Sequence, residues 1–342
     1  MKKHLLILFI WLGQFSAFAY QQSNFSAFVY HRFGDDRYPS TNISAEAFEA
    51  HLKYLKTNKV HVLTMHEALK QLKADNSILP STAVITIDDA YKSFYKNGWP
   101  LLKKYGFKAT LFVNTKTVGA GDFMTWEQIK EVKAAGIEVA NHSHAHSYFL
   151  NDFKTSEFSS DLIISHRYFE RMLGEWPNGY AYPYGEWNEE MTQLLDSLGY
   201  QYATAQNSGP IYKDSPMFRL PRFPMSNTYA DIDEFKQKLT VNALEVNQLE
   251  VIKSGFQGSI RKPRLLISFK EGDYDLKNLQ SFIQGSEAKK SIEVLKDGVV
   301  RLSLWPETAI SKRRTLFTVT VTDRNGKWHW FSYSYVLPGF MP

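Results

Sequence analysis

The chain contains no cysteine among its 342 residues, so disulfide bonds and a thiol nucleophile are both excluded. The chain also lacks a strong excess of charge of one sign, since it has 40 Lys and Arg residues and 35 Asp and Glu residues. It contains neither basic blocks nor nucleic-acid-binding motifs. Neither a G-x-G-x-x-G sequence nor a P-loop lysine motif follows an expected strand. These absences argue against nucleic acids and nucleotides as partners.

Long apolar runs are absent except near the start of the chain. Lys2 and Lys3 precede an apolar run over residues 5–12, and Ala17-Phe18-Ala19 supplies the small residues of a cleavage site. The run is too short to cross about 30 Å of hydrocarbon, so the pattern predicts a secretory signal peptide over residues 1–19. We expect cleavage near Ala19 and a secreted or periplasmic protein without stable membrane insertion.

The charge of the mature chain is mildly positive. Loss of Lys2 and Lys3 with the signal peptide lowers the formal charge from +5 to +3, since residues 1–19 contain no Asp or Glu. A small excess of this kind suits a weakly anionic partner such as a cell-wall polymer.

The length of the chain and a change in its pattern predict two domains after the signal peptide. Over residues 20–244, short strands alternate with helices, which is typical of βαβ units and favours a closed or nearly closed barrel. Over residues 245–342, strands separated by turns predict a small all-β sandwich. The expected fold class is therefore α/β, with a (β/α) barrel followed by a β-sandwich.

Individual elements are visible in the apolar patterns and capping residues. Ser44 is placed to cap a helix that carries Phe48 on one apolar face, and Thr125 with Gln128 has the spacing of a capping box. Strands of the first domain are expected at residues 27–30, 83–87, 108–113, 136–140, 179–182 and 200–204, and those of the second at 264–269, 299–304, 315–321 and 327–333.

Three polar clusters directly follow expected strands, at the strand ends where barrel enzymes assemble their active sites. They are Asp88-Asp89, the segment His142 to His146, and Pro183-Tyr184-Gly185. Taken singly, an Asp pair can simply cap the next helix, and histidines can lie in a solvated loop. The shared position of the clusters makes them candidates for one site.

His142 and His146 lie four residues apart, so one helical turn would aim both imidazoles the same way and leave His144 pointing elsewhere. Two neutral imidazoles and one carboxylate form a catalytic metal shell with open positions. Two adjacent carboxylates cannot share one task, so one can bind metal while the other accepts a proton from a water that the metal acidifies.

These residues resemble a known family. The runs Thr86 to Tyr91, His142-Ser-x-x-His146 and Pro183-Tyr-Gly185 look like the first three motifs of polysaccharide deacetylases, carbohydrate esterase family 4, with its NodB-like homology domain. The resemblance implies a deformed (β/α) barrel. It also implies Asp88 as general base, Asp89, His142 and His146 as ligands of a divalent metal, usually Zn²⁺, and the backbone N–H of Tyr184 as an oxyanion donor.

The chain departs from the family pattern at two places. Many members carry an arginine that tethers the base, and that position is Ala181 here; Arg222 is the candidate replacement, with an ordinary surface arginine as the alternative. The late Leu-x-His motif has no match after residue 205. His31, in Phe28-Val-Tyr-His31, resembles the permuted arrangement of biofilm-polysaccharide deacetylases and would be the general acid, with a buried structural histidine as the alternative.

Aromatic residues gather beside the expected site. Tyr182 and Trp187 flank the Pro183 turn, and flat rings offer apolar faces to sugars, although core filling is the ordinary alternative. We expect Tyr182, Pro183, Trp187 and Arg222 to contribute to substrate binding.

The expected activity is hydrolysis of acetyl groups from N-acetylglucosamine units of peptidoglycan or a related envelope glycan. A poly-N-acetylglucosamine deacetylase, a catalytically inactive carbohydrate-binding homologue and an O-acetyl esterase are the alternatives. Ala181 and the missing late histidine favour the inactive homologue, whereas the intact metal and base residues oppose it. The C-terminal β domain is expected to bind glycan or protein.

Overall fold

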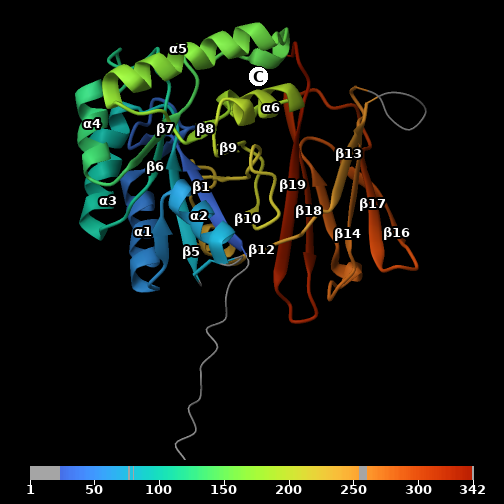
Figure 1. The fold of residues 1–342 in the computed structure, drawn as a ribbon. Coiled ribbons are helices and arrows are strands. Elements are labelled where there is room, and N and C mark those ends of the chain that lie inside the picture. Colours follow the sequence, from blue (N-terminus) through green and yellow to red (C-terminus); the bar gives the residue numbers. More distant parts are fainter. Residues whose placement is uncertain (1–23, 76–77, 80, 254–259, 341–342) are drawn as a thin grey trace, which may run out of the picture.

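The structure, a computed structural model, describes residues 24–75, 78–79, 81–253 and 260–340, so the predicted signal peptide lies outside the described residues. Its N-terminal part is a curled, mostly parallel sheet covered by helices (Figure 1). The strand order is β10-β1-β5-β6-β7-β8-β9, with β11 beside β1 and β4 beside β5. The expected deformed (β/α) barrel is confirmed, as a curled and incompletely closed sheet.

The elements of this part follow the predicted alternation. The strands are β1 (Asn24–Tyr30), β4 (His61–Leu63), β5 (Thr82–Ile87), β6 (Thr110–Val113), β7 (Glu138–Asn141), β8 (Gly179–Ala181), β9 (Tyr202–Thr204), β10 (Pro210–Tyr212) and β11 (Phe223–Pro224), and a short pair joins β2 (Arg32–Phe33) to β3 (Asn42–Ile43). The helices are α1 (Ala45–Thr57), α2 (Met65–Asp75), α3 (Trp99–Tyr105), α4 (Trp126–Ala134), α5 (Thr155–Leu173), α6 (Glu189–Ser197) and α7 (Ile232–Thr240).

Local sequence explains where several helices begin. The Ser44 side chain accepts a hydrogen bond from the Ala47 N–H at the start of α1. Both bonds of the predicted capping box are present between Thr125 and Gln128 at the start of α4. Helices α2 and α7, which no capping or apolar pattern had indicated, cover the same sheet.

Parallel strands buried on both faces hold the core. Every residue of β1 and β5 is buried, as expected where helices cover one face of the curled sheet and side chains fill the other. Because β5, β6, β7 and β8 pair in parallel, their carboxyl ends open at the same edge. The three polar clusters follow three of these strands.

The C-terminal part consists of two four-stranded sheets around a separate apolar core. Their orders are β12-β19-β18-β15 and β13-β14-β17-β16. The strands are β12 (Asn242–Ala243), β13 (Gln248–Ile252), β14 (Arg264–Lys270), β15 (Gln280–Ile283), β16 (Ala288–Val294), β17 (Val299–Pro306), β18 (Arg314–Thr322) and β19 (Trp328–Val336). These sheets stand beside the barrel, with β19 next to β12 (Figure 1).

A buried ion pair joins the two parts. Arg313, just before β18, donates to both carboxylate oxygens of Glu186 at 2.7 and 2.6 Å, and both side chains are almost inaccessible to solvent. Glu186 directly follows the Pro183-Tyr184-Gly185 turn. The C-terminal sheets therefore hold the segment that carries one of the three polar clusters.

No helix among the described residues is both long and apolar enough to span a bilayer.

Substituting Glu186→Gln removes the charge that compensates buried Arg313, and breaking such a pair costs about 3–5 kcal/mol of unfolding free energy. Urea unfolding of the purified protein measures this loss. Glu307→Gln, which removes a half-exposed carboxylate paired with Lys289, is the matched control and should change stability by about 0.5 kcal/mol or less. Equal stability of the two variants would contradict a linking role for Glu186.

Candidate active site

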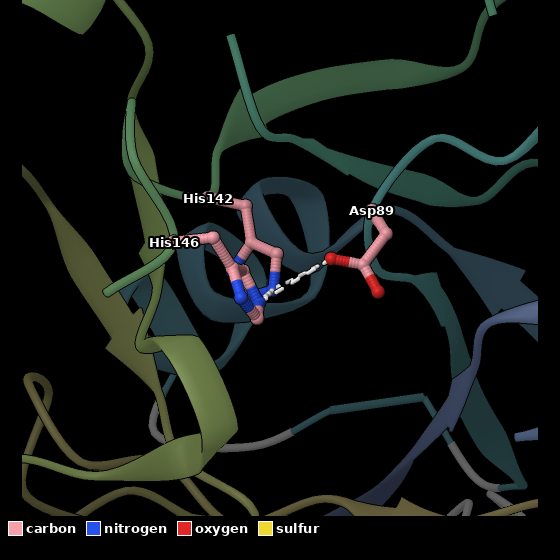
Figure 2. Close-up of side chains that lie close together, drawn as sticks. All are labelled: Asp89, His142 and His146. Atoms are coloured by element: carbon pink, nitrogen blue, oxygen red, sulfur yellow. Dashed lines mark hydrogen bonds and ion pairs between the residues drawn. The ribbon is translucent and has the colours of Figure 1, made fainter. Parts of the chain in front are cut away.

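Asp89, His142 and His146 converge at the carboxyl edge of the sheet (Figure 2). Asp89 Oδ1 lies 3.4 Å from the Nε2 atom of each histidine, and the two Nε2 atoms are 3.2 Å apart. Metal–ligand bonds of about 2.0–2.1 Å at tetrahedral angles separate the ligand atoms by about 3.3 Å. The three side chains thus fit a divalent cation such as Zn²⁺, with coordination positions left open toward the cleft.

The protein fixes the orientation of the His142 ring. Its Nδ1 lies 2.8 Å from the carbonyl oxygen of Ala181, which can only accept, so Nδ1 carries the proton and Nε2 presents its lone pair to the cation position. Burial, and then the neighbouring His142, lower the pKa of His146 to about 4. A neutral imidazole is the form that binds metal.

The loop between the two histidines is not the helical turn expected from their spacing. Ser143 and His146 both have positive φ, at 72° and 52°, so the backbone doubles back on itself. The Ser143 hydroxyl accepts from the His146 N–H, and the buried Asp161 carboxylate of α5 accepts from the N–H groups of His144 and Ala145. Asp161 thereby stabilises the loop without being a member of the triad.

His144 lies away from the triad, as expected. Its Nδ1 is hydrogen-bonded to Thr115 Oγ1 at 2.9 Å, and its ring stacks on Tyr168.

Asp88 contacts Arg222, whereas Asp89 lies beside the two histidines. The chain turns after β5, where Asp89 and Ala90 adopt positive φ. Arg222 donates to both Asp88 oxygens at 2.7 and 2.9 Å, and both side chains are fully buried. Burial alone would raise the pKa of the Asp88 carboxyl, but Arg222 and His142 outweigh it and hold the pKa well below its usual value. Asp88 is therefore ionised at neutral pH.

Arg222 is not an ordinary surface arginine. It also donates to Thr86 Oγ1 and to the Ala205 carbonyl, both at 3.1 Å. Its contact with Asp88 is the one expected of the missing motif arginine. Complete burial prevents it from touching a substrate, however, and the expected substrate-binding role of Arg222 does not fit this geometry.

His31, in the segment after β1, also lies near the Asp88 carboxylate. Its Nε2 is 3.9 Å from Asp88 Oδ2, and its side chain is 19% exposed at the cleft surface. Burial lowers the pKa of His31, while the carboxylates of Asp88 and Asp89 act in the opposite direction. The histidine is thus within reach of a substrate in the cleft, and its role as general acid stays a prediction.

The Pro183-Tyr184-Gly185 turn is shaped by backbone constraints. Tyr184 has a φ of 59°, and Gly185 has a φ of 71° with no room for a Cβ, which would lie 2.5 Å from the backbone nitrogen of Gln206. The Tyr184 ring stacks on Tyr148 and meets His146 edge-on. Arg314 of β18 donates to the Tyr184 carbonyl and to Gln206 Oε1, which secures the turn from the C-terminal sheets.

The aromatic residues expected to bind substrate lie elsewhere. Tyr182 is completely buried and its hydroxyl donates to the Phe218 carbonyl, and Pro183 is also buried. Trp187 packs edge-on against Tyr333 and borders a different cavity. Of this cluster, only Tyr184 borders the cleft of the triad.

The cleft around the triad has a volume of 930 Å³, at the upper end of the about 300–1,000 Å³ typical of ligand sites. Residues of the barrel and of the C-terminal sheets line it together, among them His31, Tyr91, Tyr229, Gln284, Lys312 and Arg314.

Comparison with known proteins gives the family. The family model "Polysaccharide deacetylase" matches residues 76–203, which contain Asp88, Asp89, His142, His146 and Tyr184. YxkH of Bacillus subtilis, which is named for the same family, is 33% identical over 187 residues, covering 55% of this chain and 67% of YxkH. The chain belongs to the polysaccharide deacetylases.

Further comparisons give another relative in sequence and two solved structures with a similar fold. A Staphylococcus aureus protein named poly-beta-1,6-N-acetyl-D-glucosamine N-deacetylase is 28% identical over 60% of this chain and 76% of its own length. The structure of IcaB from Ammonifex degensii superposes with a TM-score of 0.55 at 26% identity, covering 61% of this chain and 95% of IcaB. A Streptococcus pyogenes deacetylase, PplD, solved with acetate, reaches a TM-score of 0.58 at 23% identity over 63% of this chain and 98% of PplD.

No sequence pattern had pointed to Asp161 or Arg314 in this deacetylase. Asp161 accepts a hydrogen bond from the backbone of the His142–His146 loop, and Arg314 donates one to the backbone of the Tyr184 turn. Both residues are distant in sequence from the loops that they contact, so only the folded chain reveals these contacts.

The variant Arg222→Met should leave the buried Asp88 carboxylate unpaired and raise its pKa. The acid limb of the pH profile of kcat/KM for acetate release should move to higher pH, because the base must be deprotonated. The free energy of unfolding should fall by about 3–5 kcal/mol. Arg222→Lys keeps the charge without the bidentate contact and should show a smaller shift, whereas an unmoved acid limb in both variants would contradict the assignment.

The variant Asp161→Asn should weaken metal binding by about 10–100-fold, as loss of an outer hydrogen-bonding partner of a metal site does. Competition with a chromogenic chelator measures the dissociation constant. Asp152→Asn, at an exposed position on the same side of the molecule, serves as control and should bind metal like the unchanged protein. Equal dissociation constants in the two variants would show that Asp161 does not secure the ligand loop.

Proposed function

We propose that this deacetylase is a metal-dependent N-deacetylase of N-acetylglucosamine units in a polysaccharide. The observation that carries the proposal is the triangle of Asp89, His142 and His146 beside an ionised Asp88 in one open cleft. Amide hydrolysis needs a nucleophilic water, a base, a stabilised oxyanion and an acid for the leaving nitrogen. The residues around the triad can supply each of these.

The residues divide the work as follows. Asp88 accepts a proton from the attacking water, and Arg222 holds the carboxylate in place and ionised. The Tyr184 N–H donates to the developing oxyanion, and His31 protonates the amine as the C–N bond breaks, so the products are acetate and a free amine. Asp89, His142 and His146 would hold a divalent cation such as Zn²⁺, which would polarise the carbonyl as a Lewis acid and acidify water near it.

Peptidoglycan or a related envelope glycan is the proposed polymer, because a mildly basic exported chain suits a weakly anionic wall. Poly-β-1,6-N-acetylglucosamine is the second candidate, favoured by the name of the Staphylococcus aureus relative and by the early position of His31. The cleft of 930 Å³ is compatible with either polymer.

The setting of the enzyme belongs to the same proposal. The pattern of residues 1–19 supports a signal peptide cleaved near Ala19 and a secreted or periplasmic location. We further propose a deacetylase domain over residues 20–244 and a β-sandwich domain over residues 245–342. An apolar core separate from those of the barrel, made by Leu244 and residues that follow it, supports this division.

An inactive carbohydrate-binding homologue is the weaker alternative. It was suggested by Ala181 and by the missing late histidine, but Arg222 contacts the base and His31 reaches the cleft. Arg222 is thus a candidate to replace the missing motif arginine, and His31 is a candidate to replace the missing late histidine.

The variant Asp88→Asn should lower turnover by about 10²–10⁴-fold while keeping the metal content, because it removes the proton acceptor and leaves Asp89, His142 and His146 in place. His142→Ala should lose both turnover and metal. Acetate release from N-acetylglucosamine oligomers and elemental analysis measure the two quantities. His144→Ala, outside the triad, is the control and should keep both. Full activity in Asp88→Asn would refute the base assignment.

A further inference from the structure

One wall of the catalytic cleft belongs to the C-terminal sheets. Gln284, which follows β15, and Ser311, Lys312, Arg313 and Arg314 at the start of β18 line the same cavity as the triad. A polymer whose acetylated sugar lies at the triad would therefore also contact these strands. The C-terminal sheets are therefore positioned to contact the sugars next to the one that reacts.

The charges on this wall are of one sign. Among the residues that line the cleft, Asp89 is the single carboxylate, and it belongs to the metal triad. The cations are Lys312, Arg313 and Arg314. Because the acidic side chain is used by the cation site, the wall presents uncompensated positive charge to the rest of the cleft.

The three cations differ in what satisfies them. Arg313 is buried and paired with Glu186, so its charge is already compensated. Arg314 donates to the neutral oxygens of Tyr184 and Gln206 and forms no ion pair with a carboxylate among the described residues; burial lowers its pKa, and the carboxylate of Glu186, already paired with Arg313, acts in the opposite direction. Lys312 is exposed and forms no ion pair with any described residue. Lys312 and Arg314 are therefore available to an anion in the cleft.

We propose that Lys312 and Arg314 form a subsite for a carboxylate carried by a sugar next to the N-acetylglucosamine that is deacetylated. The inference rests on the proposed function and specifies its substrate as an anionic glycan rather than a neutral homopolymer. A guanidinium and an ammonium are the groups that bind carboxylates in proteins, and the same charges disfavour the amine left by an earlier deacetylation. The β-sandwich then determines specificity.

The test compares two forms of one polymer. Glycan strands of peptidoglycan, stripped of their peptides, carry a lactyl carboxylate on every second sugar, and carbodiimide coupling to methylamine neutralises these groups without changing strand length. The metal-loaded enzyme should show a kcat/KM about fivefold higher on the anionic strands, the size expected for one exposed ion pair. The difference should shrink at about 0.5 M salt.

The variant Lys312→Gln should reduce this preference, mainly by raising KM on the anionic strands. Lys296→Gln makes the same charge change in the turn between β16 and β17, outside the cleft, and should keep the full preference. Lys312 is the better test position because Arg314 also secures the Tyr184 turn. Equal kcat/KM on the two strand forms, or an undiminished preference in Lys312→Gln, would overturn the proposal.

Binding separates this inference from the proposed reaction. Calorimetry with metal-loaded Asp88→Asn measures strand affinity without turnover, and it should show the same preference for anionic strands and its loss on adding Lys312→Gln. If the variant binds anionic strands preferentially but the unsubstituted enzyme releases no acetate, the proposed reaction is refuted and the subsite is kept. Acetate release with equal binding of both strand forms would refute the subsite and keep the reaction.

Discussion

The buried pair between Asp88 and Arg222 is the interaction on which the site depends. Burying a carboxylate alone is costly, and burying it against a guanidinium that satisfies both of its oxygens makes the charge tolerable. Arg222 also reaches Thr86 on β5 and the carbonyl of Ala205 after β9, so it bridges two distant strands of the curled sheet. The same contact thus keeps Asp88 ionised and connects the two strands.

The metal triad is arranged by a different means. Parallel strands bring their carboxyl ends to one edge, which places Asp89 opposite His142 and His146. Local backbone strain then aims the side chains, since Asp89, Ser143, His146 and Tyr184 all adopt positive φ. Strain of this kind persists only where surrounding contacts hold it, and here Asp161 and Arg314 provide them.

The C-terminal sheets are part of the site rather than an appendage to it. Arg313 and Arg314 are consecutive residues, yet one is buried in an ion pair with Glu186 while the other holds the Tyr184 turn and lines the cleft. Alternation of side chains at the start of a strand sends neighbouring residues in different directions. The segment at the start of β18 therefore both joins the two parts of the molecule and forms part of the cleft wall.

The sequence by itself determined the alternation of strands and helices, the capping of α1 and α4, and the set of polar residues at strand ends, because these depend on local periodicity and on short motifs. The conformation of the His142–His146 loop, the burial of Tyr182 and the places of Asp161 and Arg314 were decided only by tertiary structure. Their partners lie far away along the chain, and no spacing within one segment records which distant backbone atom a side chain will meet.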